Sequence, residues 1–355
     1  MSEVMNEVNR NIKVMQSRLE FAQFGEKKEL NRADFSICLT AVHSILSKTK
    51  PVGLAPTDHP DMEKLKAHVQ HKTRGASDRE GVVNYLAKVR HYGCGRKYFD
   101  FWSTWNDKPT FNVEELKEEN RKRFEQLMEF SKPFEEIVGI KGFIAWVVAE
   151  SIQLVREAFL CVYIDEKLAS QIIADFSSMA LNTYSDWTDF ALSYVCGGCY
   201  FIYENTGNEE EVKKMCDTIL NAIEQLFFSE HNDIWAKFKW FEPKNYFNGF
   251  KAEEELASKE LGCYVTDRIS MDGAPIQYAE RQLSNPAFPD SGWKFMAGDE
   301  TNAYLSNGNN IGIFTLNYMA NYDKSILPIL DAPVGSVFVR NEQGDFVLRE
   351  AKKDE

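Results

Sequence analysis

Apolar residues recur three and four positions apart over much of residues 1–250, which is the spacing of one helix face. The first such face consists of Val4, Val8, Ile12, Met15 and Leu19. A second apolar helix is predicted from Arg32 to Ser47, ahead of a proline-rich loop at 50–60. With further helices predicted at 108–130 and 209–228, the first part of the chain is expected to be mostly helical.

Capping side chains mark the starts of three more predicted helices. Ser77, followed three residues later by Glu80, has the pattern of a capping box. Asp165 and Ser185 each precede a further apolar periodic segment, where a short polar side chain accepts from the first free N–H groups.

The segment 139–161 is apolar nearly all round, which predicts a buried central helix. The most apolar stretch, 142–164, nevertheless carries Glu150, Gln153, Arg156 and Glu157. Charged groups are costly inside a bilayer, so we do not expect this helix to cross a membrane.

Short runs rich in β-branched and aromatic residues replace the helical pattern after about residue 260, at 263–265, 311–314 and 336–339. A short helix is predicted at 322–330. We therefore expect an α+β protein of two domains, a mostly α-helical one followed by a small antiparallel β-rich α+β one. The expected parts are a helical domain at 1–245, a linker at 246–259, a second domain at 260–349 and a charged tail at 350–355.

The segment 290–300 reads DSGWKFMAGDE and sets acidic groups around a Trp/Phe pair. A structural interpretation makes Gly292 and Gly298 turn residues, with both rings packed and the carboxylates capping turns. A binding interpretation makes the segment a loop that presents an aromatic anchor to a basic partner. Its contact residues are then Asp290, Ser291, Trp293, Phe295, Asp299 and Glu300. A catalytic interpretation uses one of the three acidic residues as an acid, a base or a metal ligand.

Three later segments complete a pattern with this motif: NIGIF at 310–314, ANYD at 320–323 and LDAPVGS at 330–336. Together they resemble the family numbered 33 among the immunity proteins of polymorphic toxin systems. The resemblance implies that the second domain neutralises a toxin by stoichiometric binding. We expect Pro333 and Gly335 to fix a turn. We expect Asn321 and Asp323 to cap a short helix.

The helical part is similar to the bacterial family called domain of unknown function 1266, over a core at about 20–205. The similarity rests on Ala145-Trp146, on YIDE at 163–166 and on SDWTDF at 185–190, with Tyr194 and Gly198 beyond them. Trp146, Trp187 and Gly198 are expected to be structural. Val147 stands where the family usually has an Asp, which weakens any idea of a shared acidic site.

The chain carries a net charge of −13, which argues against a nucleic-acid partner because such proteins need a basic surface. An acidic chain is compatible with a toxin that has a basic surface, and equally with mere solubility. A homo-oligomer is left open, and no membrane partner is expected. The first residues lack the basic and apolar regions of a secretory signal, so we expect a cytoplasmic protein.

Seven scattered cysteines fit reduced, buried thiols better than a disulfide framework. Cys196-Gly197-Gly198-Cys199 has the spacing of a redox pair or half a zinc site. Since it lies in an apolar helical segment without a second ligand pair, we expect the glycines to serve close helix packing. The six histidines form no HExxH motif. We therefore expect no catalytic residue, metal or cofactor.

Three hypotheses follow for the function. The first is an immunity protein that binds and neutralises a cognate toxin. The second is a regulatory or scaffolding module whose two domains only bind partners. The third is an enzyme that uses the acidic residues of the second domain, or Cys196 and Cys199.

Overall fold

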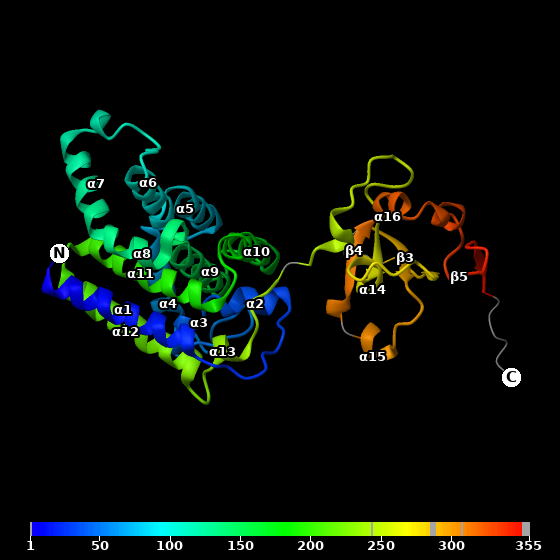
Figure 1. Ribbon diagram of the computed structural model, residues 1–355, viewed down its shortest axis with the longest axis horizontal. Helices are drawn as coiled ribbons and strands as arrows, with labels where there is room; N and C mark the ends of the chain where they lie inside the picture. The colour runs from blue at the N-terminus through cyan, green and yellow to red at the C-terminus, as the bar shows by residue number, and fades with distance from the viewer. Residues whose placement is uncertain (1, 243, 285–288, 307, 350–355) are drawn as a thin grey trace. The chain divides into compact units, whose positions relative to one another are not determined.

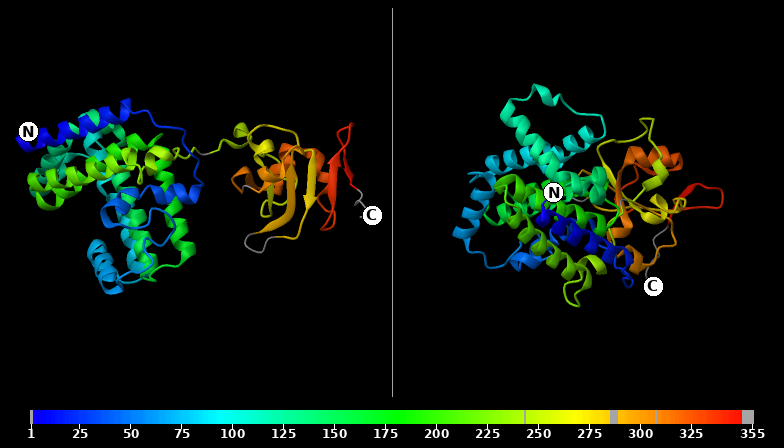
Figure 2. Two further views of the ribbon diagram at one scale, coloured as in Figure 1. Left: turned by 90° about the horizontal axis from the view of Figure 1, so that it is seen from below. Right: turned by 60° about the vertical axis from the view of Figure 1, so that its left-hand side comes forward.

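The computed structural model describes residues 2–242, 244–284, 289–306 and 308–349, with the side chain of residue 309 left out. The chain divides into two compact units, Met1–Glu242 and Pro243–Glu355, which Figures 1 and 2 show as ribbons. The first unit is helical, and the second is built on a sheet with short helices. The expected α+β layout of two domains is therefore confirmed.

The α-helices of the first unit are α1 (Glu3–Phe21), α2 (Arg32–Cys38), α3 (Ala41–Ser47), α4 (Met62–Thr73), α5 (Arg79–Tyr92), α6 (Cys94–Trp105), α7 (Glu118–Ser131), α8 (Glu135–Val138), α9 (Ile144–Leu160), α10 (Glu166–Thr183), α11 (Trp187–Thr206), α12 (Glu209–Phe228) and α13 (Ile234–Lys237). Short 3₁₀ turns lie at Val113–Glu115, Lys132–Phe134 and Gly139–Lys141. No single helix among the described residues is long and apolar enough to cross a membrane, although one sharply bent pair, Glu118–Lys141 with Ile144–Leu160, passes by length and composition.

In the helical unit, α9 packs against α10 and α11. Helix α12 also packs against α11. Gly197 and Gly198 make the α9–α11 approach possible. A Cβ on Gly197 would lie 2.5 Å from the Cβ of Trp146 on α9. A Cβ on Gly198 would lie 2.8 Å from the indole ring of Trp146 and 2.5 Å from Ile219 on α12. Any larger residue would force the two helices apart, so the expected packing role of these glycines is confirmed.

A cluster of aromatic rings forms part of the core of the helical unit. Trp187 is 1% exposed, stacks on Trp235 and donates from Nε1 to the carbonyl of Phe238 at 3.0 Å. Trp240 meets Trp187 edge-on. The structural role expected for Trp187 is thus confirmed.

Several predicted helix boundaries differ from the structure. The segment 32–47 is two helices, because Thr40 leaves the helical conformation and bonds back to the carbonyl of Ile37 at 2.8 Å. The residues that cap α5 and α11 are Asp78 and Asp186, each one position after the predicted serine. Asp165 caps α10 as predicted.

The described residues of the second unit form six strands, β1 (Gly262–Thr266), β2 (Tyr278–Arg281), β3 (Asp290–Met296), β4 (Ile311–Thr315), β5 (Val337–Arg340) and β6 (Phe346–Leu348), in the order β4-β1-β3-β2-β5-β6. The sheet is mixed, since β1 and β3 run parallel while the other neighbours are antiparallel. The expectation of an antiparallel sheet is wrong for this central pair, because a crossover that contains β2 connects its two strands. Short helices α14 (Asp267–Ser270), α15 (Asn302–Leu305) and α16 (Leu316–Tyr322) complete the unit, with 3₁₀ turns at Tyr246–Gly249, Gly308–Asn310 and Lys324–Ile329.

The segment predicted as a linker, 246–259, is instead part of the second unit. Phe247 is 8% exposed and joins the core of that unit. Asn317 of α16 accepts from the backbone N–H groups of Leu256 and Ala257 at 2.7 and 3.0 Å. The charged side chains in this segment suggested a solvated linker, but the backbone between them is held by α16.

Candidate functional site

The first half of the 290–300 motif is a strand rather than a loop. Asp290–Met296 forms β3, between β1 and β2 in the sheet. The register against β1 slips between Gly262 and Tyr264, which pair with Asp290 and Lys294, so β3 bulges at this point. Ser291 donates its hydroxyl to the carbonyl of Gly262 at 2.6 Å and so ties the bulge to β1.

Gly292 is required in this bulge. Its φ is +78°, and a Cβ there would lie 2.2 Å from the carbonyl oxygen of Gln282. Asp290 is 8% exposed, and its Oδ1 accepts from the N–H of Gly292 at 2.9 Å. The acidic residue therefore stabilises the turn of the backbone in which Gly292 sits.

The proposed aromatic anchor lies inside the domain. Trp293 and Phe295 are both fully buried, and their rings lie nearly parallel with centroids 5.9 Å apart. Trp293 also donates from Nε1 to the carbonyl of Leu330 at 3.1 Å. The binding interpretation is thus wrong for Trp293 and Phe295, and the burial of Asp290 and Ser291 removes these two from the surface as well. Side chains on this side of β3 form the core of the unit.

The second half of the motif is a turn held by its own acidic residues. Glu300 accepts from the N–H groups of Ala297 and Gly298, both at 2.8 Å, and from the hydroxyl of Thr266. Asp299 is exposed and forms a two-point ion pair with Arg268 of α14, with distances of 2.7 and 3.2 Å. The hydrogen bonds from Arg268 lower the pKa of Asp299. All three acidic residues of the motif therefore have structural partners, which disfavours the catalytic interpretation.

The remaining motif residues of the second unit are also structural. Asn321 accepts from the N–H groups of Glu253 and Glu254, and so fastens the 246–259 segment rather than capping a helix. Asp323 caps the following 3₁₀ turn by accepting from Ser325, and it pairs with Arg340. Pro333 accepts from Ser336 in a turn in which Gly335 has a φ of +91°. The turn predicted for Pro333 and Gly335 is therefore confirmed.

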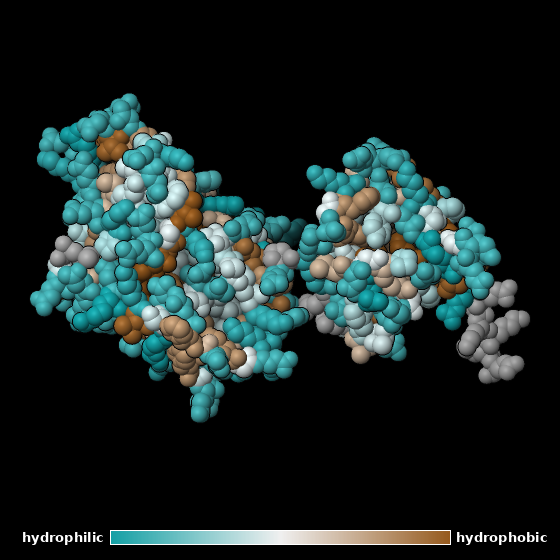
Figure 3. All heavy atoms as spheres, in the orientation of Figure 1, coloured by the Kyte–Doolittle hydropathy of each residue, from teal (hydrophilic) through white to brown (hydrophobic). Residues whose placement is uncertain are grey.

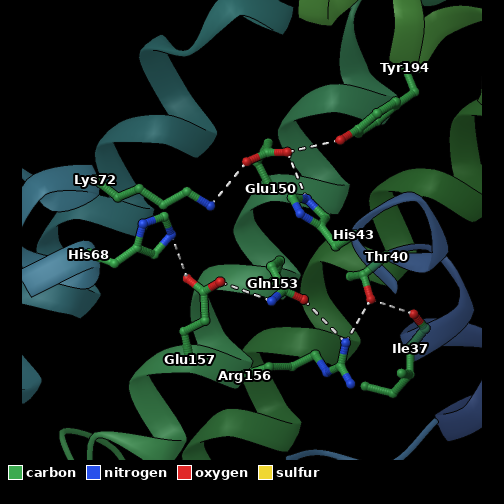
Figure 4. Close-up of polar contacts among 10 residues, drawn as sticks. All are labelled: Ile37, Thr40, His43, His68, Lys72, Glu150, Gln153, Arg156, Glu157 and Tyr194. Atoms are coloured by element: carbon green, nitrogen blue, oxygen red, sulfur yellow. Dashed lines mark hydrogen bonds and ion pairs between the residues drawn. The ribbon is translucent and has the colours of Figure 1, made fainter. Parts of the chain in front are cut away.

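The helical unit contains a polar cluster that the sequence analysis did not identify as a site (Figure 4). Its centre is Glu150 on α9, which contacts three other helices. The carboxylate accepts from the hydroxyl of Tyr194 at 3.0 Å, lies 2.8 Å from Nε2 of His43 and pairs with Nζ of Lys72 at 3.2 Å. One acidic side chain thereby connects α3, α4, α9 and α11.

A second chain of contacts continues along the same face of α9. Glu157 accepts from Gln153 at 2.9 Å, and Gln153 in turn accepts from Arg156 at 3.2 Å. Arg156 is fully buried and donates to the carbonyls of Lys50 and Gly53 at 2.8 and 3.2 Å. This arginine therefore holds the proline-containing loop after α3 against the central helix.

Charge balance in the cluster favours the ionised forms of Glu150 and Lys72. Burial raises the pKa of Glu150, but His43 and Lys72 lower it by more, so the pKa lies well below the usual range of a glutamate. Burial alone lowers the pKa of Lys72, but Glu150 and Glu157 raise it above its ordinary value. Since both oxygens of Glu150 are engaged by neighbours, the cluster is suited to joining helices rather than to accepting a proton from a substrate.

The cysteine pair of α11 is buried. Cys196 and Cys199 are both 0% exposed, and each has a pKa raised well above that of a free thiol. Burial raises the pKa of Cys196, whereas for Cys199 the contact with Cys216 comes first and burial second. A thiol with a raised pKa carries little nucleophilic thiolate. Within the described part of the chain, no group of three or more His, Cys, Asp or Glu side chains is placed to hold a metal ion.

Comparison with protein families relates these two units to two different groups. Residues 263–350 match the Immunity protein Imm33 domain. Residues 73–240 match a protein family of unknown function, DUF1266. Both resemblances noted from the sequence motifs are thus confirmed. No curated protein and no solved structure matches the chain.

The Imm33 match runs from the second residue of β1 to beyond the end of β6. The DUF1266 match begins near the end of α4 and runs past α13, so it includes the whole of α9 and α11. Trp146 lies between these helices, with its ring 4.9 Å from Tyr194 and 5.5 Å from Phe201, in keeping with the structural role predicted for it.

A signal for the α9 cluster was present in the sequence. Glu150, Gln153, Arg156 and Glu157 stand at positions i, i+3, i+6 and i+7, which is one face of a helix. On an otherwise apolar helix, such a stripe predicts buried polar partners on neighbouring helices. The partners His43 and Lys72 could not be found in this way, because they come from distant segments without a motif of their own.

Proposed function

We propose that this protein is an immunity protein, which binds a cognate toxin stoichiometrically and thereby neutralises it. The observation that carries the proposal is the match of residues 263–350 to the Imm33 domain, over a unit that has its own core. We further propose that the protein acts in a polymorphic toxin system and in the cytoplasm, where such a toxin would meet its target.

Binding rather than catalysis is the mechanism that the geometry supports. The carboxylates of Asp290, Asp299 and Glu300 hold turns and an ion pair, and the buried thiols of α11 have raised pKa values. The net charge of −13 favours encounter with a toxin that has a basic surface, because complementary potentials speed association.

The direct test is co-expression of this chain with the toxin encoded beside its gene, followed by co-purification. We expect restored growth and a complex of fixed stoichiometry. Growth inhibition that persists, together with the absence of a complex between the purified proteins, would contradict the proposal.

A titration of toxin activity separates neutralisation by binding from enzymatic inactivation of the toxin. We expect toxin activity to fall linearly with added protein and to vanish at a fixed molar ratio. Toxin recovered after denaturation and separation should be fully active and unchanged in mass. Loss of activity at a small molar fraction of this protein would instead indicate catalysis.

A further inference from the structure

The sheet of the second unit has one face that is not filled by the core. Cross-strand partners share a face, and the register places Ile313, Tyr264, Lys294, Glu280 and Val337 in one row across five strands. All of these side chains are half-buried or exposed, and Ile313 is 55% exposed. The buried Trp293, Phe295 and Ala279 lie on the opposite face. This row defines what we call the open sheet face.

The edge of the open sheet face contains a hollow of about 600 Å³. Tyr278 and Val339, which are paired across β2 and β5, contribute to its lining. The turn at Ala297–Asp299 contributes as well, so the second half of the 290–300 motif borders the hollow. Arg268, Arg340 and Arg349 are also among its described lining residues.

Two of these arginines are already neutralised. Arg268 pairs with Asp299 and with Asp272, both at 2.7 Å. Arg340 has a side chain that is 15% exposed, pairs with Asp323 and donates to the carbonyl of Ile276 at 2.7 Å. They shape the hollow and add little net charge to it.

Arg349 differs from the other two. It follows β6 directly, is exposed, and uses its backbone N–H to bond to the carbonyl of Val337 at 2.8 Å. Its guanidinium has no hydrogen bond or ion pair to the residues that the structure describes. Among the described residues, Arg349 is therefore the arginine of the hollow that has no ion-pair partner, and the aromatic ring of Tyr278 also lines the hollow. Arginine and tyrosine are the residue types enriched at protein interfaces.

We propose that this hollow receives an acidic side chain of the partner protein, with Arg349 as its main contact. The inference rests on the proposed function and names the part of the surface that orients the toxin. A chain that is acidic overall attracts a basic partner at long range, and a single contact of the opposite polarity then fixes one orientation. The guanidinium suits this task because its fork can bind both oxygens of a carboxylate.

The test measures the affinity of the full chain for the toxin domain encoded beside its gene, by calorimetry. Arg349→Gln is expected to weaken the complex by about tenfold, and Arg349→Lys by less, because charge is kept and the fork is lost. Asp299→Asn is expected to tighten the complex by roughly threefold, because it leaves Arg268 with one carboxylate fewer. Lys251→Gln, an exposed cation in the same unit, is the matched control and should leave affinity unchanged.

The opposite responses would overturn the inference. Full affinity in Arg349→Gln, or a weaker complex in Asp299→Asn, would mean that no acidic group of the toxin enters the hollow. A tighter complex on deletion of 350–355, with no further effect of Arg349→Gln, would assign the hollow to the chain's own tail and equally overturn it. If the wild-type chain does not bind the toxin at all, the proposed function fails instead.

A second measurement does not depend on the toxin. Titration of the full chain with N-acetyl-glutamate amide, followed through the NMR signal of the Arg349 side chain, should show millimolar binding. The matching glutamine derivative should show none. Equal shifts with both compounds would show that binding does not depend on the charge of the carboxylate, which would contradict the proposal.

Discussion

The α9 stripe of the helical unit and the 290–300 motif of the sheet unit use acidic residues in opposite ways. On α9, Glu150 is surrounded by His43, Lys72 and Tyr194 from three other elements. In the motif, Glu300 mainly satisfies backbone N–H groups a few residues away. The first arrangement depends on the tertiary fold and the second on the local chain. The difference explains why the partners of Glu300 lie within its own motif, whereas those of Glu150 cannot be located from the sequence.

The largest effect is expected from Trp293→Ala, because it removes a fully buried indole and leaves a cavity in the small core of the sheet unit. Burial of this kind predicts a loss of about 4 kcal/mol in the free energy of unfolding. Hydrogen exchange of the full chain would show faster exchange in β1–β6 and unchanged exchange in α9–α12. Normal protection of the sheet in this variant would contradict the buried position of the ring.

The next largest effect is expected in the helical unit from Glu150→Gln. Loss of the negative charge leaves Lys72 and His43 without their shared partner. The free energy of unfolding is therefore expected to fall by about 3 kcal/mol. Urea denaturation followed by circular dichroism measures it. Glu136→Gln is the matched control, since Glu136 pairs with Lys13 on the surface with its side chain 74% exposed. That variant should leave the free energy of unfolding essentially unchanged, because exposed ion pairs contribute little.

Gly292→Ala is expected to lower the free energy of unfolding by about 2 kcal/mol, because it combines a positive φ with a clash against a carbonyl oxygen. Gly335→Ala has a positive φ of +91° with nothing within 4 Å, so it should cost about half as much. Thermal unfolding of the two variants isolates the steric part of the effect. Equal losses would show that the bulge in β3 can relax.

The smallest effect that we predict is a dependence on pH. Because the folded pKa of Glu150 is depressed, its contribution to stability is complete above the unfolded pKa of about 4.3 and is lost as the pH falls toward the folded value. Between pH 6 and pH 3, as rough limits, wild type should therefore lose more stability in the helical unit than Glu150→Gln does. Parallel curves for the two proteins would contradict the depressed pKa.

The helical unit was easier to predict from the sequence than the sheet unit. Its long amphipathic helices produce a clear period, and α1, α10 and α12 lie where the pattern placed them. In the sheet unit, the glycine and serine of DSGW are typical turn residues and predict a loop where the structure has strand β3. A central strand that bulges has neither a continuous apolar run nor regular alternation, which are the two usual signals.

The candidate sites could be predicted only in part. The stripe on α9 is visible in the sequence, but Lys72 and His43 become its partners only when α3 and α4 fold onto α9. The hollow beside Arg349 depends on the register of β2, β5 and β6, which no residue pattern fixes by itself. Hydropathy does not locate the hollow either, because apolar residues are scattered over the surface that Figure 3 shows.

The packing of α1 on α12 has a consequence for how the protein is made. Arg18 pairs with Glu224 across 206 positions of sequence. At about 5–20 residues per second, a ribosome needs tens of seconds to cover that interval. For most of that time the apolar side of the first helix, including Val8 and Ile12, lacks its partners α11 and α12. The nascent chain therefore exposes this apolar face until the last helices of the unit emerge.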